Sequence, residues 1–265
     1  MLITSLQNPK VKHALKLRER RQRKRDGLML IEGYDELRLA LASNVRLQTL
    51  FFCPAFFGAV EEAALLDPAR QTEAEMLEVS RDVFEKMAYR ENPDGWLGVA
   101  PAANNTLADL SLSANPLLVV AEAVEKPGNL GAILRSADAA GVEAVILCDP
   151  TVDIGNPNVI RSSRGTVFSV PVVEVTSAEA LAWLGERGIK VVAATPEAAS
   201  PFTEVDFTGP IAIVVGTERE GLSPIWREQV AVKAHIPMLG KVNSLNVATA
   251  TTLFIYEVLR QRKFV

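Results

Sequence analysis

The stretch between residues 211 and 249 places the strongest constraint on the fold. Two short apolar runs, 211–215 and 230–236, are each followed by a Gly or Pro and a polar loop. Short apolar runs closed in this way indicate buried strands of a parallel sheet. A helical apolar pattern then begins after Ser244, which can act as its N-cap. Ligands bind at the carboxyl ends of strands in such sheets, so these loops are the first candidates for a site.

Strand and helix patterns alternate along the rest of the second half as well. We expect strands at 117–121, 145–148, 167–170, 191–194, 211–215 and 230–236, and helices at 129–140, 177–187, 223–229 and 244–261. This alternation predicts an α/β fold whose mostly parallel sheet is covered by helices on both faces. We assign this domain to residues 104–265.

The first hundred residues alternate in the same way but with weaker strands. We expect helices at 3–25, 34–42, 59–66 and 82–88, and strands at 28–31, 47–53, 75–79 and 96–100. The stretch 101–106, which contains Pro and two Asn, is typical of a linker. The sequence therefore predicts a smaller N-terminal α/β domain over residues 1–103.

Charge is distributed unevenly along the chain. Residues 10–25 hold nine Lys and Arg against the single acid Glu19, a local charge of +8 (nine minus one). Because the whole chain carries −4, the remainder carries −12 (−4 minus 8). This asymmetry indicates a face that binds a polyanion on an otherwise acidic protein, although a solvated basic helix has the same pattern.

The composition favours a globular protein that needs neither a membrane nor a metal. No apolar run approaches the length that spans a bilayer, and no apolar signal-peptide core precedes the first charges. Cys53 and Cys148 lack the spacing of metal ligands, and His13 and His235 are the only histidines. We therefore expect buried free thiols, no metal site and a cytoplasmic location.

The loop between residues 125 and 131 admits a dinucleotide-binding interpretation. It joins a strand to a helix and could cradle a phosphate, and Asp149 lies near the position of a ribose-binding acid. Only Gly128 and Gly131 are present, however, so the G-x-G-x-x-G pattern is absent. An NAD-dependent oxidoreductase and a non-catalytic RNA-binding protein remain as alternative functions.

Three blocks of the sequence are Asn129-Leu-Gly-Ala-Ile-Leu-Arg135, Gly216-x-Glu218-x-x-Gly221-Leu222, and Ile236-Pro-Met238 followed by Ser244-Leu-Asn246-Val. Together they resemble the SpoU/TrmH family of RNA 2′-O-ribose methyltransferases. The second block departs from the family pattern, because Thr217, Arg219 and Glu220 stand where Ser and Gly are usual. The resemblance implies transfer of a methyl group from S-adenosylmethionine to a ribose 2′-hydroxyl of structured rRNA or tRNA. It also implies a C-terminal trefoil knot and a homodimer formed through the C-terminal domain.

The same resemblance implies the site residues. The catalytic residues it implies are Asn129, Arg135, Glu218, Ser244 and Asn246. The residues it implies for binding the cofactor are Thr195, Val215, Gly216, Ile236, Met238 and Leu245. A guanidinium is not deprotonated in a protein, so we expect Arg135 to hold a phosphate and stabilise the developing alkoxide rather than act as a base.

RNA binding is expected from two basic segments. The block 156–168 resembles the family too, and arginines suit phosphate contacts through their fork of donors. The N-terminal basic segment resembles the family's RNA-holding domain less strongly. The expected RNA-binding residues are Lys10, Lys12, Arg20, Arg21, Arg23, Arg25, Arg161 and Arg164.

Overall fold

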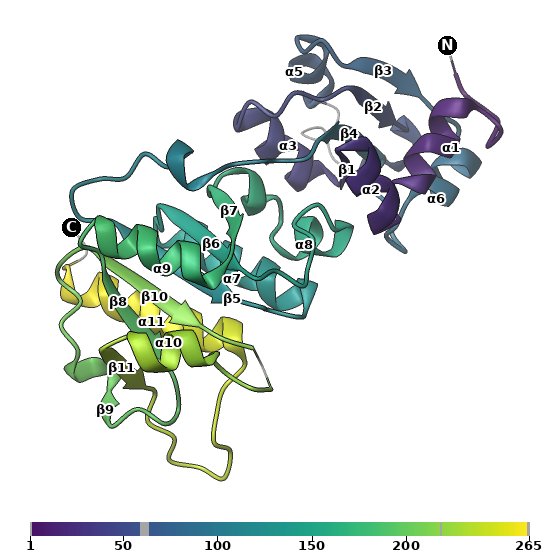
Figure 1. The fold of residues 1–265 in the computed structure, drawn as a ribbon. Helices are drawn as coiled ribbons and strands as arrows, with labels where there is room; N and C mark the ends of the chain where they lie inside the picture. The colour runs from purple at the N-terminus through teal and green to yellow at the C-terminus, as the bar shows by residue number, and fades with distance from the viewer. Residues whose placement is uncertain (1, 59–63, 218, 264–265) are drawn as a thin grey trace. The chain divides into compact units, whose positions relative to one another are not determined.

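A computed structural model describes residues 2–58, 64–217 and 219–263 of the chain (Figure 1). The chain divides into two compact units. The first unit comprises Met1–Ala103 and Asp153–Ser169, and the second comprises Asn104–Val152 and Val170–Val265. The first unit therefore includes a segment, residues 153–169, that interrupts the second unit in the sequence; we call it the inserted segment.

The first unit is built on a four-stranded sheet in the order β1-β4-β2-β3. Its strands are β1 (Leu28–Glu32), β2 (Thr49–Phe52), β3 (Glu75–Glu78) and β4 (Trp96–Pro101). β4 pairs antiparallel with β1 and β2, and β2 pairs parallel with β3. The helices are α1 (Pro9–Lys16), α2 (Arg20–Asp26), α3 (Tyr34–Ala42), α5 (Leu66–Arg70) and α6 (Arg81–Met87). The four predicted strands and the helices near 34–42 and 82–88 are confirmed, while residues 59–63 of the predicted helix 59–66 lie outside the described residues.

The prediction of one continuous helix over residues 3–25 was wrong. α1 ends at Lys16, its C-cap Leu17 is fully buried, and α2 begins at Arg20. The break leaves backbone carbonyls without helical partners, and the Nη1 of Arg23 donates to the carbonyls of Leu17 and Arg18 at 3.0 and 2.7 Å. The turn is therefore stabilised by a side chain from the helix that follows it.

The inserted segment packs into the first unit through α8 (Pro157–Ser162) and a short 3-10 turn, η3 (Thr166–Phe168). The Nη2 of Arg23 lies 2.7 Å from the Oδ2 of Asp153, and both side chains are largely buried. Gly165 has a φ of +84°, and a Cβ there would lie 2.9 Å from the Cα of Glu36. The predicted strand at 167–170 was wrong, because Val167 belongs to this turn and the strand begins only after Pro171.

The second unit is built on a seven-stranded sheet in the order β7-β6-β5-β10-β8-β11-β9. The strands are β5 (Leu117–Glu122), β6 (Ala144–Cys148), β7 (Val172–Val175), β8 (Lys190–Ala194), β9 (Ser200–Pro201), β10 (Ile211–Val215) and β11 (Val232–His235). Every pairing between these strands is parallel. The predicted parallel α/β fold is therefore confirmed.

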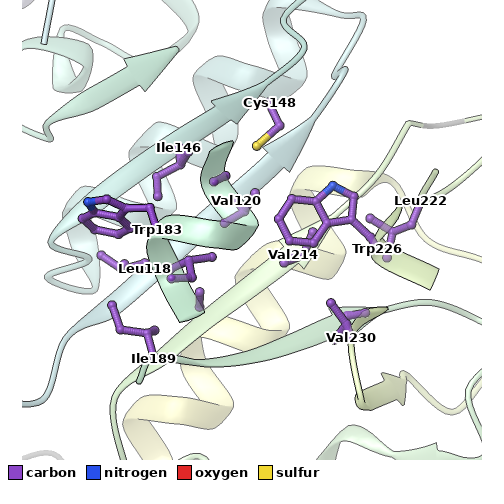
Figure 2. Packing of buried hydrophobic residues seen from close by; sticks show 14 of the residues in the cluster. Leu118, Val120, Ile146, Cys148, Trp183, Ile189, Val214, Leu222, Trp226 and Val230 are labelled. Atoms are coloured by element: carbon purple, nitrogen blue, oxygen red, sulfur yellow. The ribbon is translucent and has the colours of Figure 1, made fainter. Parts of the chain in front are cut away.

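Helices cover both faces of this sheet. α9 (Ser177–Glu186) and α10 (Pro224–Gln229) lie on one face, and α7 (Pro127–Ala139) and α11 (Val247–Gln261) lie on the other (Figure 1). Because strand side chains alternate, Val120, Ile146 and Val214 point to the first face, where they pack with Trp183 and Trp226 (Figure 2). Each buried aliphatic side chain contributes about 1.5–3 kcal/mol relative to an exposed one. Within the described residues, no helix combines the length and the apolar character that crossing a membrane requires.

Candidate functional site

Four neighbouring strands of the second unit present their carboxyl ends along one edge of the sheet. These are β5, β10, β8 and β11, adjacent in that order. Val215 ends β10 and is followed by Gly216, Thr195 follows β8, and Ile236 follows β11. The backbone N–H of Thr195 donates to the carbonyl of Ala234 at 3.0 Å, which ties two of these ends together. Four of the six expected cofactor-binding residues therefore lie along this edge.

The first turns of α7 and α11 meet beside this edge. The Nδ2 of Asn246 donates to the Oδ1 of Asn129 at 3.1 Å. Further along, the hydroxyls of Ser136 and Thr252 are 2.6 Å apart. Because both contacts advance toward the C-terminus in each helix, the helices run parallel with their N-termini side by side. The positive ends of two helix dipoles and two amide side chains are thus brought together.

Asn246, and not Ser244, is the N-cap of α11. Its Oδ1 accepts from the backbone N–H of Ala248 at 2.9 Å, and the helix begins at Val247. The prediction that Ser244 caps this helix was therefore wrong. Ser244 is exposed, and its Oγ lies 3.4 Å from the Oδ1 of Asn243. Ser244 lies in the exposed loop before α11, so a role in the site depends on the conformation that this loop adopts.

Arg135 lies on the exposed surface of α7, six residues after Asn129. Within the described part of the chain, its guanidinium forms no hydrogen bond or ion pair. The charge is therefore available to an anion from outside the protein.

Two backbone hydrogen bonds hold together the ends of the loop that follows β10. Thr217 N–H donates to the carbonyl of Gly221 at 3.0 Å, and Gly221 N–H returns the bond at 3.2 Å. A Cβ at Gly216 would lie 2.3 Å from the carbonyl carbon and oxygen of Gly221. The loop itself therefore requires a glycine at position 216. Glu218, at the middle of the loop, lies outside the described residues.

The segment between β11 and α11 is exposed although it is rich in apolar side chains. Leu239 is 100% exposed, Val242 64% and Leu245 38%, while Ile236 and Met238 are partly buried. Among the described residues, the backbone of 237–245 forms no backbone hydrogen bond. Apolar side chains beside free N–H and C=O groups suit a flat heteroaromatic ring, whose faces are apolar and whose edge forms hydrogen bonds. The residues present therefore fit the adenine of S-adenosylmethionine.

Asp149 does not have the environment of a ribose-binding acid. Its Oδ2 accepts from the backbone N–H and the Oγ of Ser177, at 3.1 and 2.6 Å, so the carboxylate is already used at the start of α9. This arrangement weighs against the dinucleotide alternative. Within the described residues, no cluster of three or more His, Cys, Asp and Glu could hold a metal ion.

The basic residues of the first unit divide into free and occupied cations. Arg23 is 4% exposed and bonded to Asp153 and two carbonyls, so the structure places it inside the unit. Lys10, Arg25 and Arg164 form ion pairs with Glu75, Asp26 and Asp35, respectively. Arg20 also has a partner in the structure. Three expected residues are exposed and without a partner among the described residues, namely Lys12, Arg21 and Arg161.

A hollow of about 470 Å³ opens between α1 and α2. Its lining includes Lys12, Lys16 and Arg25, together with the pair formed by His13 and Asp26. Hydrogen bonds from His13, Gln22 and Arg25 lower the pKa of Asp26 to about 2. Lys16 was not among the expected RNA-binding residues; it lies in the same charge run, and only the structure shows that it faces the hollow.

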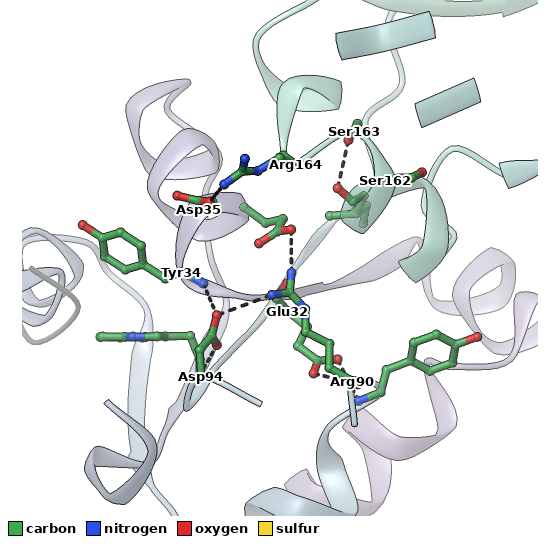
Figure 3. Close-up of polar contacts among 12 residues, drawn as sticks. Glu32, Tyr34, Asp35, Arg90, Asp94, Ser162, Ser163 and Arg164 are labelled. Atoms are coloured by element: carbon green, nitrogen blue, oxygen red, sulfur yellow. Dashed lines mark hydrogen bonds and ion pairs between the residues drawn. The ribbon is translucent and has the colours of Figure 1, made fainter. Parts of the chain in front are cut away.

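A second polar cluster surrounds the start of α3 (Figure 3). Arg90 pairs with Glu36 at 2.5 Å and with Asp94 at 3.5 Å, and its Nη2 donates to the carbonyl of Glu32 at 3.0 Å. The Glu32 carboxylate accepts the backbone N–H groups of Tyr89 and Arg90. Burial raises the pKa of both Glu32 and Glu36, against the lowering effect of these partners. No sequence pattern points to Glu36, Arg90 or Asp94 as members of one cluster.

A parallel α/β unit with adjacent loops at its carboxyl edge is typical of domains that bind a nucleotide-like cofactor. The chain belongs to the SpoU rRNA Methylase family, whose model matches residues 116–256. A model described as the MRM3-like substrate binding domain matches residues 8–98. These matches confirm the resemblance carried by the three sequence blocks.

Similar proteins cover nearly the whole chain. RlmP of Bacillus subtilis, named as a 23S rRNA (guanosine(2553)-2′-O)-methyltransferase, is 31% identical over 97% of this chain and 98% of its own. A solved structure described as an RNA 2′-O ribose methyltransferase is 39% identical, covers 99% of both chains and has a TM-score of 0.85. An AdoMet-bound rRNA methyltransferase from Sinorhizobium meliloti is 27% identical, covers 98% of this chain and 97% of that one, and has a TM-score of 0.89.

Proposed function

We propose that this protein transfers a methyl group from S-adenosylmethionine to a ribose 2′-hydroxyl of ribosomal RNA. The observation that carries the proposal is the meeting of Asn129 and Asn246 beside the carboxyl edge of β10, β8 and β11. This edge joins segments that are far apart in the sequence, and they are the segments that hold the family's motifs. The family assignment and the similar proteins that carry this activity in their names support the same reaction.

The cofactor would be held by the strand-end loops. Val215 and Gly216, Thr195, Ile236 and Met238 follow one another along the edge, and the free backbone groups of 237–245 would bind the adenine edge. Leu245 would add apolar surface. When bound, S-adenosylmethionine supplies a methyl group on a sulfonium, which needs no metal to activate it.

The catalytic part of the site is proposed to consist of polar side chains on both helices and their loops. Asn129 and Asn246 would orient the ribose, and the free guanidinium of Arg135 would hold a phosphate and stabilise the negative charge that develops on the attacking oxygen. Its proton would leave through phosphate or water. Glu218 and Ser244 are proposed to complete the site.

RNA is proposed to bind through the first domain, residues 1–103. The free cations Lys12 and Arg21 and the hollow between α1 and α2 support a phosphate-binding surface there. Lys10, Arg20, Arg25 and Arg164 are proposed to contribute after exchanging their present partners for phosphate. Arg161, which has no partner among the described residues, is proposed to contribute directly. Arg23 is not included, since it is buried. Residues 104–265 would then form the methyltransferase domain.

The methyltransferase domain is proposed to contain a C-terminal trefoil knot and to form a homodimer. The exposed apolar side chains of the 237–245 segment and of α11, among them Leu239 and Tyr256, support a partner surface. Replacing Leu239 with Asp should therefore shift the protein toward a monomer, as measured by analytical ultracentrifugation. A mass of one chain for the wild type at micromolar concentration would contradict the dimer. We place the protein in the cytoplasm, where ribosomal RNA is found.

Isothermal titration with S-adenosylmethionine, run beside NAD, tests the cofactor. We expect binding of the methyl donor and none of NAD. Transfer of a radiolabelled methyl group to ribosomal RNA, followed by nucleoside analysis, then tests the reaction. A folded protein that binds RNA but not S-adenosylmethionine would favour the non-catalytic alternative.

A further inference from the structure

Glu122 is a buried carboxylate at the last position of β5. The residue is 4% exposed, and within the described residues no Lys, Arg or His forms an ion pair with it. A buried charge without a cation is costly unless hydrogen bonds satisfy it. The hydrogen-bond partners of this carboxylate therefore indicate its structural role.

Each carboxylate oxygen of Glu122 binds a different segment. The Oε2 accepts the backbone N–H of Ser223 at 2.8 Å, and the Oε1 lies 3.1 Å from the Oγ of Ser177 at the start of α9. The same hydroxyl accepts from the Nε1 of Trp226 at 3.0 Å. Glu122 thus links the end of β5 to the first turns of α9 and α10.

Ser223 is the residue at which the loop after β10 ends. It is the N-cap of α10, and Leu222 before it is buried against the same core as Trp226 (Figure 2). The other end of the loop, Gly216, follows Val215, which pairs with Ala121 of β5. One end of the loop is therefore fixed by strand pairing with β5, and the other by a hydrogen bond to the side chain of the next residue of β5.

The hydroxyl of Ser223 has no part in this link. It is buried, forms no hydrogen bond among the described residues and does not cap α10. Only the backbone N–H connects Ser223 to Glu122. The hydrogen bond between Ser223 and Glu122 can therefore be removed by a substitution at Ser223 that keeps Glu122 itself unchanged.

We propose that Glu122 is a positioning residue that holds the 216–222 loop against the carboxyl edge of the sheet. The role rests on the proposed function, in which this loop contributes Gly216 to cofactor binding. Glu122 itself does not touch the reacting groups. Its carboxylate accepts the backbone N–H of Ser223. Without this hydrogen bond, the C-terminal end of the loop would lose its attachment to β5.

Two substitutions of Ser223 test this role. The φ of Ser223 is −67°, a value that proline adopts, so Ser223→Pro removes the N–H without requiring a change of φ, and its ring carbon displaces the Glu122 carboxylate from this position. Ser223→Ala removes only the hydroxyl, which forms no hydrogen bond among the described residues, and is the matched control. We expect Ser223→Pro to bind S-adenosylmethionine about tenfold more weakly, the effect of losing one hydrogen bond to a charged group. Ser223→Ala should retain the wild-type affinity.

Substitutions of Glu122 provide the second arm. Glu122→Ala should lose affinity as Ser223→Pro does. Glu122→Gln should restore it, because an amide oxygen can accept from Ser223 and an amide N–H can donate to the Oγ of Ser177. Binding is measured by titration on protein shown to be folded by circular dichroism, and RNA affinity should stay unchanged in all four variants.

The outcomes separate this role from the proposed function. Wild-type affinity in folded Ser223→Pro, or equal losses in Ser223→Pro and Ser223→Ala, would overturn the role of Glu122 alone. A wild-type protein that fails to bind S-adenosylmethionine would overturn both.

Discussion

Arg135 combines an exposed position on α7 with a guanidinium that has no partner among the described residues. Substitution with Ala should therefore leave the fold and the affinity for S-adenosylmethionine nearly unchanged. Methyl transfer should fall by at least about a hundredfold, the order of effect of removing one electrostatic contact to the transition state. Single-turnover transfer of a radiolabelled methyl group measures this rate.

Arg135→Lys is the matched control, because it keeps the charge and loses the planar fork. Partial activity in the Lys variant would support a role for charge at the transition state. Unfolding of Arg135→Ala would instead show that the side chain is structural.

The thiol of Cys148 is fully buried in the core cluster that contains Trp183 and Trp226 (Figure 2). Burial, helped by the charges of Asp149 and Glu122, raises the pKa of this thiol to about 12. At about pH 8 roughly one thiol in ten thousand is then ionised, and the thiolate is the reactive form. We expect no alkylation of Cys148 by iodoacetamide in the native protein and complete alkylation in urea, as measured by mass spectrometry. Fast labelling of the native protein would contradict this environment.

At the level of single residues, the sequence predicted which residues belong to the candidate site better than it predicted how their side chains are oriented. Asn129 and Asn246 were both expected at the site, and they lie in contact. Ser244 and Asn246 are both good N-caps, and only the backbone geometry decides that Asn246 takes this role. In the same way, a run of like charges does not reveal that Arg23 turns inward to fill the break between two helices.

The start of α3 shows how an element can depend on buried acids. Because burial raises the pKa of Glu32 and Glu36, the folded state takes up protons at a higher pH than the unfolded chain. The contribution of these two groups to the free energy of unfolding should therefore increase as the pH falls from about 7 toward the ordinary glutamate value of 4.5. Glu36→Gln should reduce this increase, as measured by urea unfolding across that range.

Glu85→Gln is the control for this pH effect. Glu85 is 49% exposed and pairs with Arg81 on the surface, so its removal should leave the pH dependence as in the wild type. A Glu36→Gln protein with the wild-type pH dependence would contradict the assignment.

Most elements could be predicted because their apolar patterns are local. The continuous runs of β5, β6 and β10 are buried throughout, as expected for a sheet covered on both faces. The predictions failed where tertiary contacts decide. Val167 resembles part of a strand, but Gly165 in a left-handed conformation and Pro171 confine it to a 3-10 turn.

Across the whole molecule, the uneven charge predicts a salt-dependent affinity for RNA. Replacing Lys12 and Arg21 with Gln should weaken binding and reduce the slope of log affinity against log salt by roughly 0.7 for each phosphate that is no longer neutralised. The control replaces Arg70 and Arg81, which are exposed but paired with Asp67 and Glu85. Both double variants remove the same charge, so equal slopes in filter-binding titrations would contradict a localised RNA surface.

The parallel sheet of the second unit could be predicted from the sequence, since it follows from local apolar patterns. The path of the chain between β11 and α11 could not, because periodicity carries no information on how one segment passes another. A knot and a dimer were expected from family resemblance alone.

The inserted segment sets a condition on biosynthesis. The first unit contains Asp153–Ser169 as well as Met1–Ala103. A chain leaving the ribosome therefore cannot complete its N-terminal unit until residue 169 has emerged, by which time β5, α7 and β6 are already outside. Domains usually fold in order of synthesis. In this protein, the unit whose synthesis begins first cannot fold completely until the inserted segment has been synthesised. Until then, Arg23 lacks Asp153, its ion-pair partner.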